Sequence, residues 1–118
     1  AYTINISADA ALNYGGNTID DVAENSLVTA GTEGYGIEVN GGDSTNGPTT
    51  ITESGNFNDD DTPIPLSPTA LITSDGPNAP GGTDTANTVL VTHRAAISTA
   101  TVVGNYDQLV TYTVSGTF

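Results

Sequence analysis

The residues able to carry out chemistry are few in this chain of 118 residues. It contains 14 Asp and Glu but a single cationic side chain, Arg94, next to the single histidine, His93, and it has no Cys and no Lys. Neighbouring residues of a strand point to opposite faces, so we expect His93 and Arg94 not to act as a pair. No nucleophile-elbow motif accompanies them. We therefore interpret His93 as a structural residue and predict that the protein is not an enzyme.

The charge balance excludes several classes of partner. The formal net charge is −13, and binding nucleic acid takes Lys and Arg side chains that this chain lacks. Without Cys there is no disulfide and no thiolate metal ligand, and without Lys there is no Lys-based isopeptide cross-link. No apolar run reaches the roughly 18 residues of a membrane span. We expect no nucleic acid partner, no membrane insertion and, in any assembly, non-covalent contacts only.

One acidic run has part of the pattern of a calcium loop. Residues 56–62 read Asn-Phe-Asn-Asp-Asp-Asp-Thr and offer oxygen atoms at alternate positions, as a calcium ion requires. An EF-hand is excluded because Asp61 stands where its loop needs Gly and Ser67 where it needs Glu. Two interpretations stay open, a solvated acidic turn and a calcium site made by Asp59, Asp60 and Asp61. No other cofactor is predicted.

The N-terminal stretch has the clearest alternation in the sequence. A period of two places its apolar residues on one face of an extended strand. Residues 1–14 are predicted to form one very long strand, or two in line with a bend at residues 9–11, followed by a turn at Gly15 and Gly16. The apolar positions of this predicted strand are Tyr2, Ile4, Ile6, Ala8, Ala10, Leu12 and Tyr14.

The rest of the chain, residues 15–118, is predicted to be a single all-β domain. Seven or eight strands separated by turn residues favour an antiparallel β-sandwich with immunoglobulin-like topology. Segments 54–65 and 74–87 are predicted loops, strand 35–39 directs Glu38 to water, and strand 88–96 is apolar enough on both faces to be central. The last predicted strand, 105–118, has one apolar face for the core or for assembly, made of Tyr106, Val110, Tyr112, Val114 and Phe118.

The C-terminal residues 96–114 carry a family resemblance. The pattern Gly-x-Tyr-x-x-x-Val-Thr-x-Thr-Val of residues 104–114 resembles the closing hairpin of bacterial surface and pilus β-sandwich subunits, including spore coat protein U-like domains and chaperone-usher pilins. The resemblance implies an extracellular, non-enzymatic structural subunit that assembles by donor-strand complementation. The Cys residues common in those domains are absent here. A chain that begins with Ala1 suits a secreted protein whose signal has been removed.

The N-terminal strand has two interpretations of equal weight. It is either the first strand of its own domain or a donor strand that completes the sheet of a second copy, a β-augmentation whose head-to-tail form gives an open filament. We adopt a pilus-like filament of identical subunits at the cell surface. Residues 2–8, and as far as Leu12, would be inserted, and the receiving edges would be strand 88–96 and strand 106–118.

Two alternatives to this function are retained. One is a secreted adhesin or carbohydrate-binding module, in which Tyr14, Tyr35 and the loop 74–87 contact the ligand. The other is a monomeric, calcium-stabilised domain of a larger surface protein. In a filament the charge of −13 recurs in every subunit, so assembly is predicted to strengthen with salt or Ca²⁺, which screen the repulsion.

Overall fold

The computed structural model describes residues 1–40, 44–46, 49–58, 60–76 and 89–116. Within these ranges the chain forms strands and no helix, so no helix there could cross a membrane. All pairs of named strands are antiparallel. The predicted all-β, antiparallel fold is thereby confirmed. The strands are β1 (Tyr2–Ala8), β2 (Asn13–Tyr14), β3 (Asn17–Thr18), β4 (Gly34–Asn40), β5 (Ser44–Asn46), β6 (Thr49–Glu53), β7 (Thr69–Ser74), β8 (Leu90–Ala96) and β9 (Val110–Gly116).

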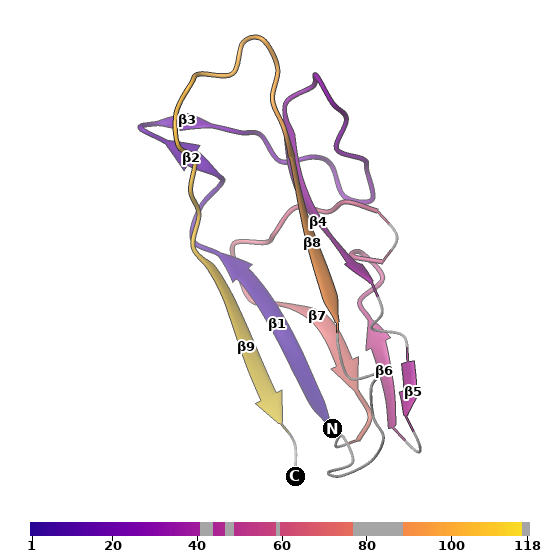
Figure 1. Cartoon of the computed structure of the whole chain (residues 1–118). Coiled ribbons are helices and arrows are strands. Elements are labelled where there is room, and N and C mark those ends of the chain that lie inside the picture. Colours follow the sequence, from indigo (N-terminus) through magenta and orange to yellow (C-terminus); the bar gives the residue numbers. More distant parts are fainter. Residues whose placement is uncertain (41–43, 47–48, 59, 77–88, 117–118) are drawn as a thin grey trace.

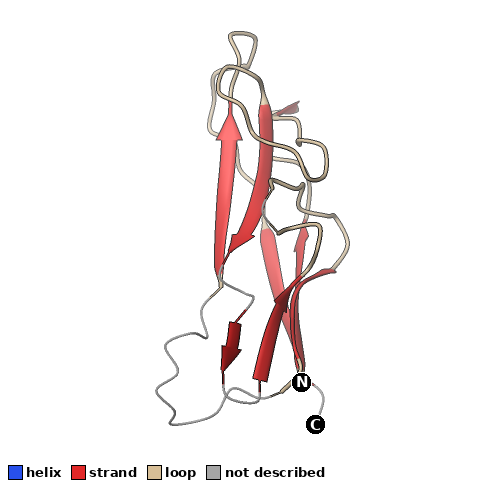
Figure 2. Cartoon of the chain, turned by 90° about the vertical axis from the view of Figure 1, so that its right-hand side faces the viewer, coloured by secondary structure: helices blue, strands red, loops and turns tan. Residues whose placement is uncertain are grey.

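The largest sheet has five strands in the order β5-β6-β7-β1-β9. The N-terminal strand β1 lies inside this sheet, and the C-terminal strand β9 lies at its edge (Figure 1). The register between β1 and β9 is regular over the whole length of β1, whereas the pairing of β1 with β7 shifts between Ile4 and Asn5. The molecule is elongated, 50 × 24 × 22 Å, and the start of β1 and the end of β9 lie at the same end of it (Figure 2).

A second pair of strands, β4 and β8, adds three buried residues of β4 to the hydrophobic core. Alternate residues of β4 are apolar, and the three on its inner face, Tyr35, Ile37 and Val39, are buried together with residues of the large sheet. Burial of this apolar surface is the main term that stabilises the fold. The core also contains Ile6, Ala8, Ile19, Ile51, Phe57, Ile64, Leu71 and Ile72.

The segment between β6 and β7 is a loop that forms isolated bridges with β4. Its backbone pairs with the free edge of β4, where the N–H of Ile37 and that of Thr62 each donate to the other residue's carbonyl oxygen at 2.9 Å. Phe57 is buried in the core, and Asp61 is 1% exposed. The predicted loop at 54–65 does lie between strands. Burial of Phe57 and Asp61 shows, however, that the acidic run within it is not a simply solvated turn.

The N-terminal stretch is two strands, not one. β1 ends at Ala8, residues 9–12 form bends, and β2 begins at Asn13, so the interpretation with a bend is the confirmed one. β2 and β3 make a two-residue hairpin through Gly15 and Gly16, whose φ angles of 55° and 87° are those of a type I′ turn, which glycine adopts without strain.

Candidate functional site

The predicted donor strand is a fully paired strand of its own subunit. Its apolar face turns to the core, where Ile6 is 0% and Ala8 4% exposed, and Tyr2 and Ile4 are partly buried beside them. The alternation read from the sequence thus identified the buried face correctly. Because β1 lies between β7 and β9, removing it would leave both of these strands without their shared neighbour.

The bend after β1 holds the other two predicted donor residues, Ala10 and Leu12. Each residue of this bend is hydrogen-bonded. Asp9 N–H donates to the Leu109 carbonyl at 3.1 Å, and Asp9 Oδ1 accepts the Leu109 N–H at 2.9 Å. The carbonyls of Ala10, Ala11 and Leu12 accept hydrogen bonds from Gln108 Nε2, Asn13 Nδ2 and the Ile19 N–H at 2.8, 2.9 and 2.9 Å. Leu12 packs against the core, and the backbones of Asn13 and Asp107 pair beyond it at 3.0 Å. Residues 9–12 are therefore a short connection that is fixed to the segment before β9 and to Ile19.

The apolar face of the C-terminal strand is largely exposed to water. Val110, Tyr112 and Val114 lie directly opposite Ala8, Ile6 and Ile4, and directly opposed residues share a face. Yet Tyr112 is 47% and Val114 66% exposed. The core side of β9 is thus continuous with the core but open to water.

Two residues predicted to belong with that strand are placed elsewhere or not described. Tyr106 precedes β9, which begins only at Val110. Its hydroxyl donates to the Val102 carbonyl at 2.8 Å, and its ring lies 5.9 Å from that of Tyr14, so it braces the loop before β9. Phe118 lies outside the described residues.

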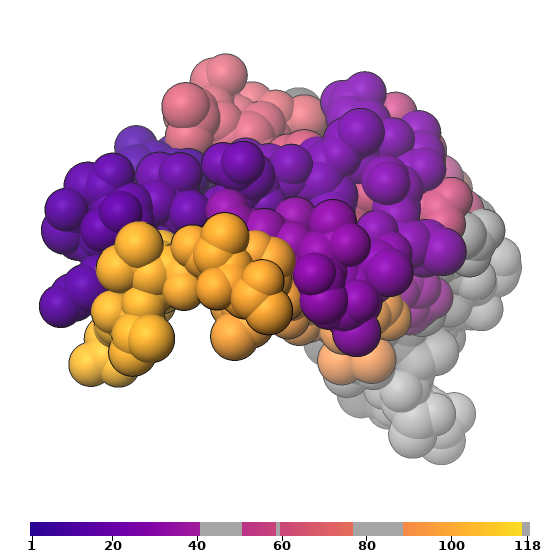
Figure 3. Space-filling model, turned by 90° about the horizontal axis from the view of Figure 1, so that it is seen from above, coloured from indigo at the N-terminus to yellow at the C-terminus, as the bar shows by residue number. Residues whose placement is uncertain are grey.

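The strand β8 is an edge strand in the described part of the chain, not a central one as predicted. It pairs only with β4, and on its core side His93 and Ala95 are exposed although they lie opposite buried residues of β4. Viewed along the long axis, the molecule is hollowed on the side where the orange and gold atoms of β8 and the segment after it lie (Figure 3). One side of the core is thus bordered by two strand edges, β8 and β9.

A cavity of about 580 Å³ follows the same edge of β8. It lies between β8 and the loop at residues 28–31, and its walls combine small residues with the larger side chains of His93, Arg94 and Ile97. The lining residues are Val28, Ala30, Gly31, His93, Arg94, Ala95, Ala96 and Ile97.

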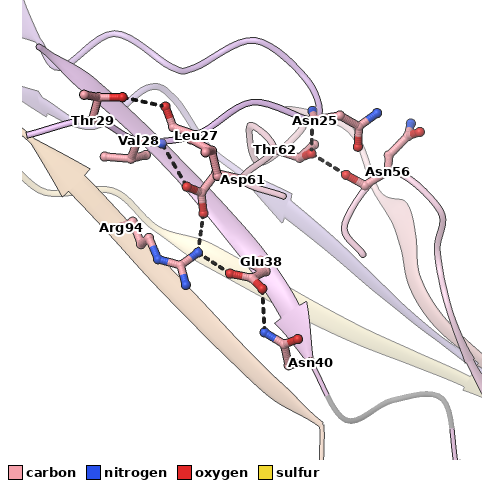
Figure 4. Close-up of polar contacts among 10 residues, drawn as sticks. All are labelled: Asn25, Leu27, Val28, Thr29, Glu38, Asn40, Asn56, Asp61, Thr62 and Arg94. Carbon is pink, nitrogen blue, oxygen red and sulfur yellow. Dashed lines mark hydrogen bonds and ion pairs between the residues drawn. The ribbon is translucent and has the colours of Figure 1, made fainter. Parts of the chain in front are cut away.

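The only cationic side chain of the protein is at the centre of a polar cluster on the outer face of β4 and β8 (Figure 4). Arg94 Nη1 donates to Asp61 Oδ1 at 2.6 Å and also to Glu38 Oε2. The other oxygen of Asp61 accepts the Val28 N–H at 2.9 Å, and the other oxygen of Glu38 accepts Asn40 Nδ2 at 2.8 Å. The cluster joins β4, β8, the segment that contains Asp61 and the loop at Val28.

The hydrogen bonds of this cluster change the acidities of its members. Hydrogen bonds from Asn40 and then from Arg94 hold the pKa of Glu38 below its usual value, because they favour the charged carboxylate. Hydrogen bonds to Asp61 and Glu38 raise the pKa of Arg94. Glu38 is thus ion-paired, not simply solvated as expected.

Of the three residues of the predicted calcium site, the structure gives hydrogen bonds for Asp61. Asp59 lies outside the described residues. Both carboxylate oxygens of Asp61 already accept hydrogen bonds, from Arg94 and from Val28, so this group would have to give up an ion pair to bind a metal. Among the described residues no three His, Asp or Glu side chains are grouped as metal ligands would be. Whether Asp60 contributes to a calcium site stays a prediction.

One of the two tyrosines that the adhesin alternative places in contact with a ligand, Tyr35, is buried. Tyr35 is 5% exposed, and its hydroxyl lies 2.9 Å from His93 Nδ1, within hydrogen-bond distance. Burial, with added repulsion from Asp21 and Tyr112, raises the pKa of Tyr35 to about 12. Of the two tyrosines proposed to contact a ligand, only Tyr14 is exposed, and residues 77–87 of the proposed loop lie outside the described residues.

The comparisons with known proteins do not add to this picture. No protein-family model, no curated protein and no solved structure matches the chain. The resemblance of residues 96–114 to pilus subunits therefore stays a prediction.

Sequence reasoning missed the ion-paired cluster. Because the sequence has a single Arg and 14 acidic residues, an ion pair of Arg94 with some carboxylate could have been predicted. The identity of its partners depends on the pairing of the 54–65 segment with β4, which brings Asp61 next to β8 from 33 residues away.

Proposed function

We propose that this protein is an immunoglobulin-like β-sandwich that polymerises into an extracellular filament by exchanging β1 between copies. In the free subunit β1 completes its own sheet; in the filament the same strand, from the next subunit, occupies the place between β7 and β9. The observation that carries the proposal is the position of β1: it is the first strand of the chain, yet it lies inside the sheet and fills the core.

The energetics favour exchange over the addition of a new strand. An incoming β1 would make the contacts that the resident β1 makes now, with Ile6 and Ala8 in the same buried sites. The exchanged and unexchanged states then differ little in free energy, which is why exchange of an identical element is a low-cost route to assembly. Each subunit donates at one site and receives at another, so the contact does not close on itself and continues as a fibre.

The charge distribution also supports exchange. The first acidic residue of the chain is Asp9, so β1 carries no acidic side chain, and the neighbouring strand β9 carries none either. The strands that would meet between subunits are therefore free of the repulsion that a charge of −13 imposes elsewhere. Lack of Cys and Lys leaves strand pairing and apolar packing as the means of holding subunits together.

Deletion of residues 1–8 tests the proposal. The shortened chain keeps β2 and β3 but lacks the strand between β7 and β9, so we expect it to form no filaments by electron microscopy. A synthetic peptide of residues 1–8 should restore folding, seen by circular dichroism, and give monomers that do not polymerise. A peptide in which Ile4 and Ile6 are replaced by Asp is the matched control and should not rescue. Filaments formed by the shortened chain without peptide would refute the proposal.

A further inference from the structure

The strand β9 pairs with β1 along one edge, and its other edge has no partner among the described residues. Within the described ranges β9 hydrogen-bonds only to β1. The Asp9 N–H donates to the Leu109 carbonyl, so along this antiparallel pair the odd-numbered residues of β9 direct their main-chain groups to β1. The even-numbered residues, Tyr112 and Val114 among them, then direct theirs to the free edge.

Among the residues that the structure describes, this edge lacks the features that usually protect an edge strand. Proteins discourage unwanted pairing with charged residues, proline or a covering element. The sequence of β9, Val-Thr-Tyr-Thr-Val-Ser-Gly, contains no charge and no proline, and six of its seven residues are exposed. No acidic residue follows Asp107 in a chain whose net charge is −13. Copies of this chain can therefore approach one another along β9 with little repulsion.

The sequence of β9 is also complementary to itself. If two copies pair in antiparallel fashion about Thr113, every residue of β9 gains a partner: Tyr112 lies opposite Val114 of the other copy, and Thr111 opposite its Ser115. Apolar residues then meet on the core side and hydroxyl residues on the outer side. Aromatic residues opposite β-branched ones, and Thr opposite Thr or Ser, are among the stabilising cross-strand pairs.

We propose that β9 is a self-association edge through which two copies join their five-stranded sheets into one continuous sheet. The pairing covers the main-chain groups of the free edge and shields Tyr112 and Val114, which are 47% and 66% exposed in the single chain. The antiparallel arrangement keeps the two Asp107 carboxylates at opposite ends of the joint. The strand β8, the edge strand on the other side of the open core, is a poorer partner for itself. Symmetric pairing about His93 would bring the imidazoles together and Arg94 close to its copy.

This inference does not depend on the exchange of β1, because β1 contacts the opposite edge of β9. A filament built by exchange would pair side by side with a second filament, and an unexchanged subunit would form a dimer.

The absence of native Cys gives a position-specific test. Symmetric pairing about Thr113 makes it a non-hydrogen-bonded pair with its own copy, at a Cα separation of about 4.5 Å, which a disulfide can span. Under mild oxidation Thr113→Cys is expected to give disulfide-linked dimers on a denaturing gel. Thr111→Cys is the matched control: it lies on the same strand and face, but the two copies of residue 111 would be about 13 Å apart and should stay unlinked.

A second variant tests the edge without a cross-link. Thr113→Lys places like charges opposite each other on the outer face, so we expect the dimer dissociation constant to rise several-fold in sedimentation experiments while the circular dichroism spectrum stays unchanged. Three results would each overturn the inference: no cross-link at position 113, equal cross-linking at 111 and 113, or a mass that remains monomeric at the concentrations used for cross-linking. None of these results bears on filament formation through β1, which the deletion of residues 1–8 tests separately.

Discussion

Arg94 fixes the relative position of four segments of the chain. As the only cationic side chain it neutralises Asp61, a carboxylate that is 1% exposed, and a buried charge is tolerated only when it is paired and hydrogen-bonded. The second ion pair, to Glu38, ties β8 to β4 from the partly exposed side. The cluster thus holds β4, β8, the segment of Asp61 and the loop at Val28 together.

The lowered pKa of Glu38 predicts a pH dependence of stability. A depressed carboxylate pKa contributes stability that is fully present above the ordinary value of 4.5 and is lost as the pH falls through the lower folded-state value. Glu38→Gln should therefore be less stable than the unchanged protein at about pH 7 and equally stable at about pH 2. Urea unfolding at both pH values measures this, with the exposed Glu24→Gln as control. A deficit that persists at the low pH would contradict the assignment.

At the scale of the elements, the N-terminal strand shows what the sequence could and could not predict. Alternation identified the buried face of β1 because Ile4, Ile6 and Ala8 share one side of a strand whose other side is polar. It could not show that β1 lies inside the sheet, because partners chosen from distant parts of the chain leave no local pattern. The same reason made β8 look central: its sequence is apolar on both faces, but its outer edge has no partner in the described residues.

The close approach of a loop to β4 gives a prediction at this scale. A Cβ added at Gly36 would lie 2.8 Å from Val22 Cγ2 and 3.1 Å from Asp61 Cβ, whereas one added at Gly55 would meet nothing within 4 Å. Gly36→Ala forces the two segments apart and should lower the free energy of unfolding by about 1–3 kcal/mol. Gly55→Ala, the control, should change it by less than about 0.5 kcal/mol. Equal effects of the two substitutions in chemical denaturation would refute the packing described.

The whole molecule combines an elongated shape with an uneven distribution of charge. Thirteen of the 14 acidic residues lie before residue 85, and only Asp107 follows. Strands β1, β8 and β9, which form or border the open side of the core, carry no acidic residue. In the proposed assembly, repulsion between acidic residues would keep copies apart over most of the surface and would leave these strands as the places where they meet.

Assembly should therefore respond to ionic strength. Raising NaCl from about 10 mM to about 150 mM shortens the screening length from about 30 to 8 Å, so the sedimentable fraction of filaments should increase. Light scattering during the salt titration measures this. CaCl₂ and MgCl₂ at matched ionic strength separate screening from binding: a stronger effect of Ca²⁺ would support a calcium site at Asp59 and Asp60. Assembly that is indifferent to salt would contradict the role given to charge.

The most direct test of strand exchange asks which copy supplies β1. Thr3 on β1 lies opposite Ser115 on β9, at a Cα separation of about 5.5 Å for a hydrogen-bonded pair, which a disulfide can span. The protein with Thr3→Cys and Ser115→Cys, oxidised before assembly, should give intramolecular disulfides and no filaments. Assembled under reducing conditions and then oxidised, it should give a ladder of covalently linked subunits on a denaturing gel. Filaments that yield only monomers after oxidation would contradict exchange, because each β1 would then belong to its own subunit.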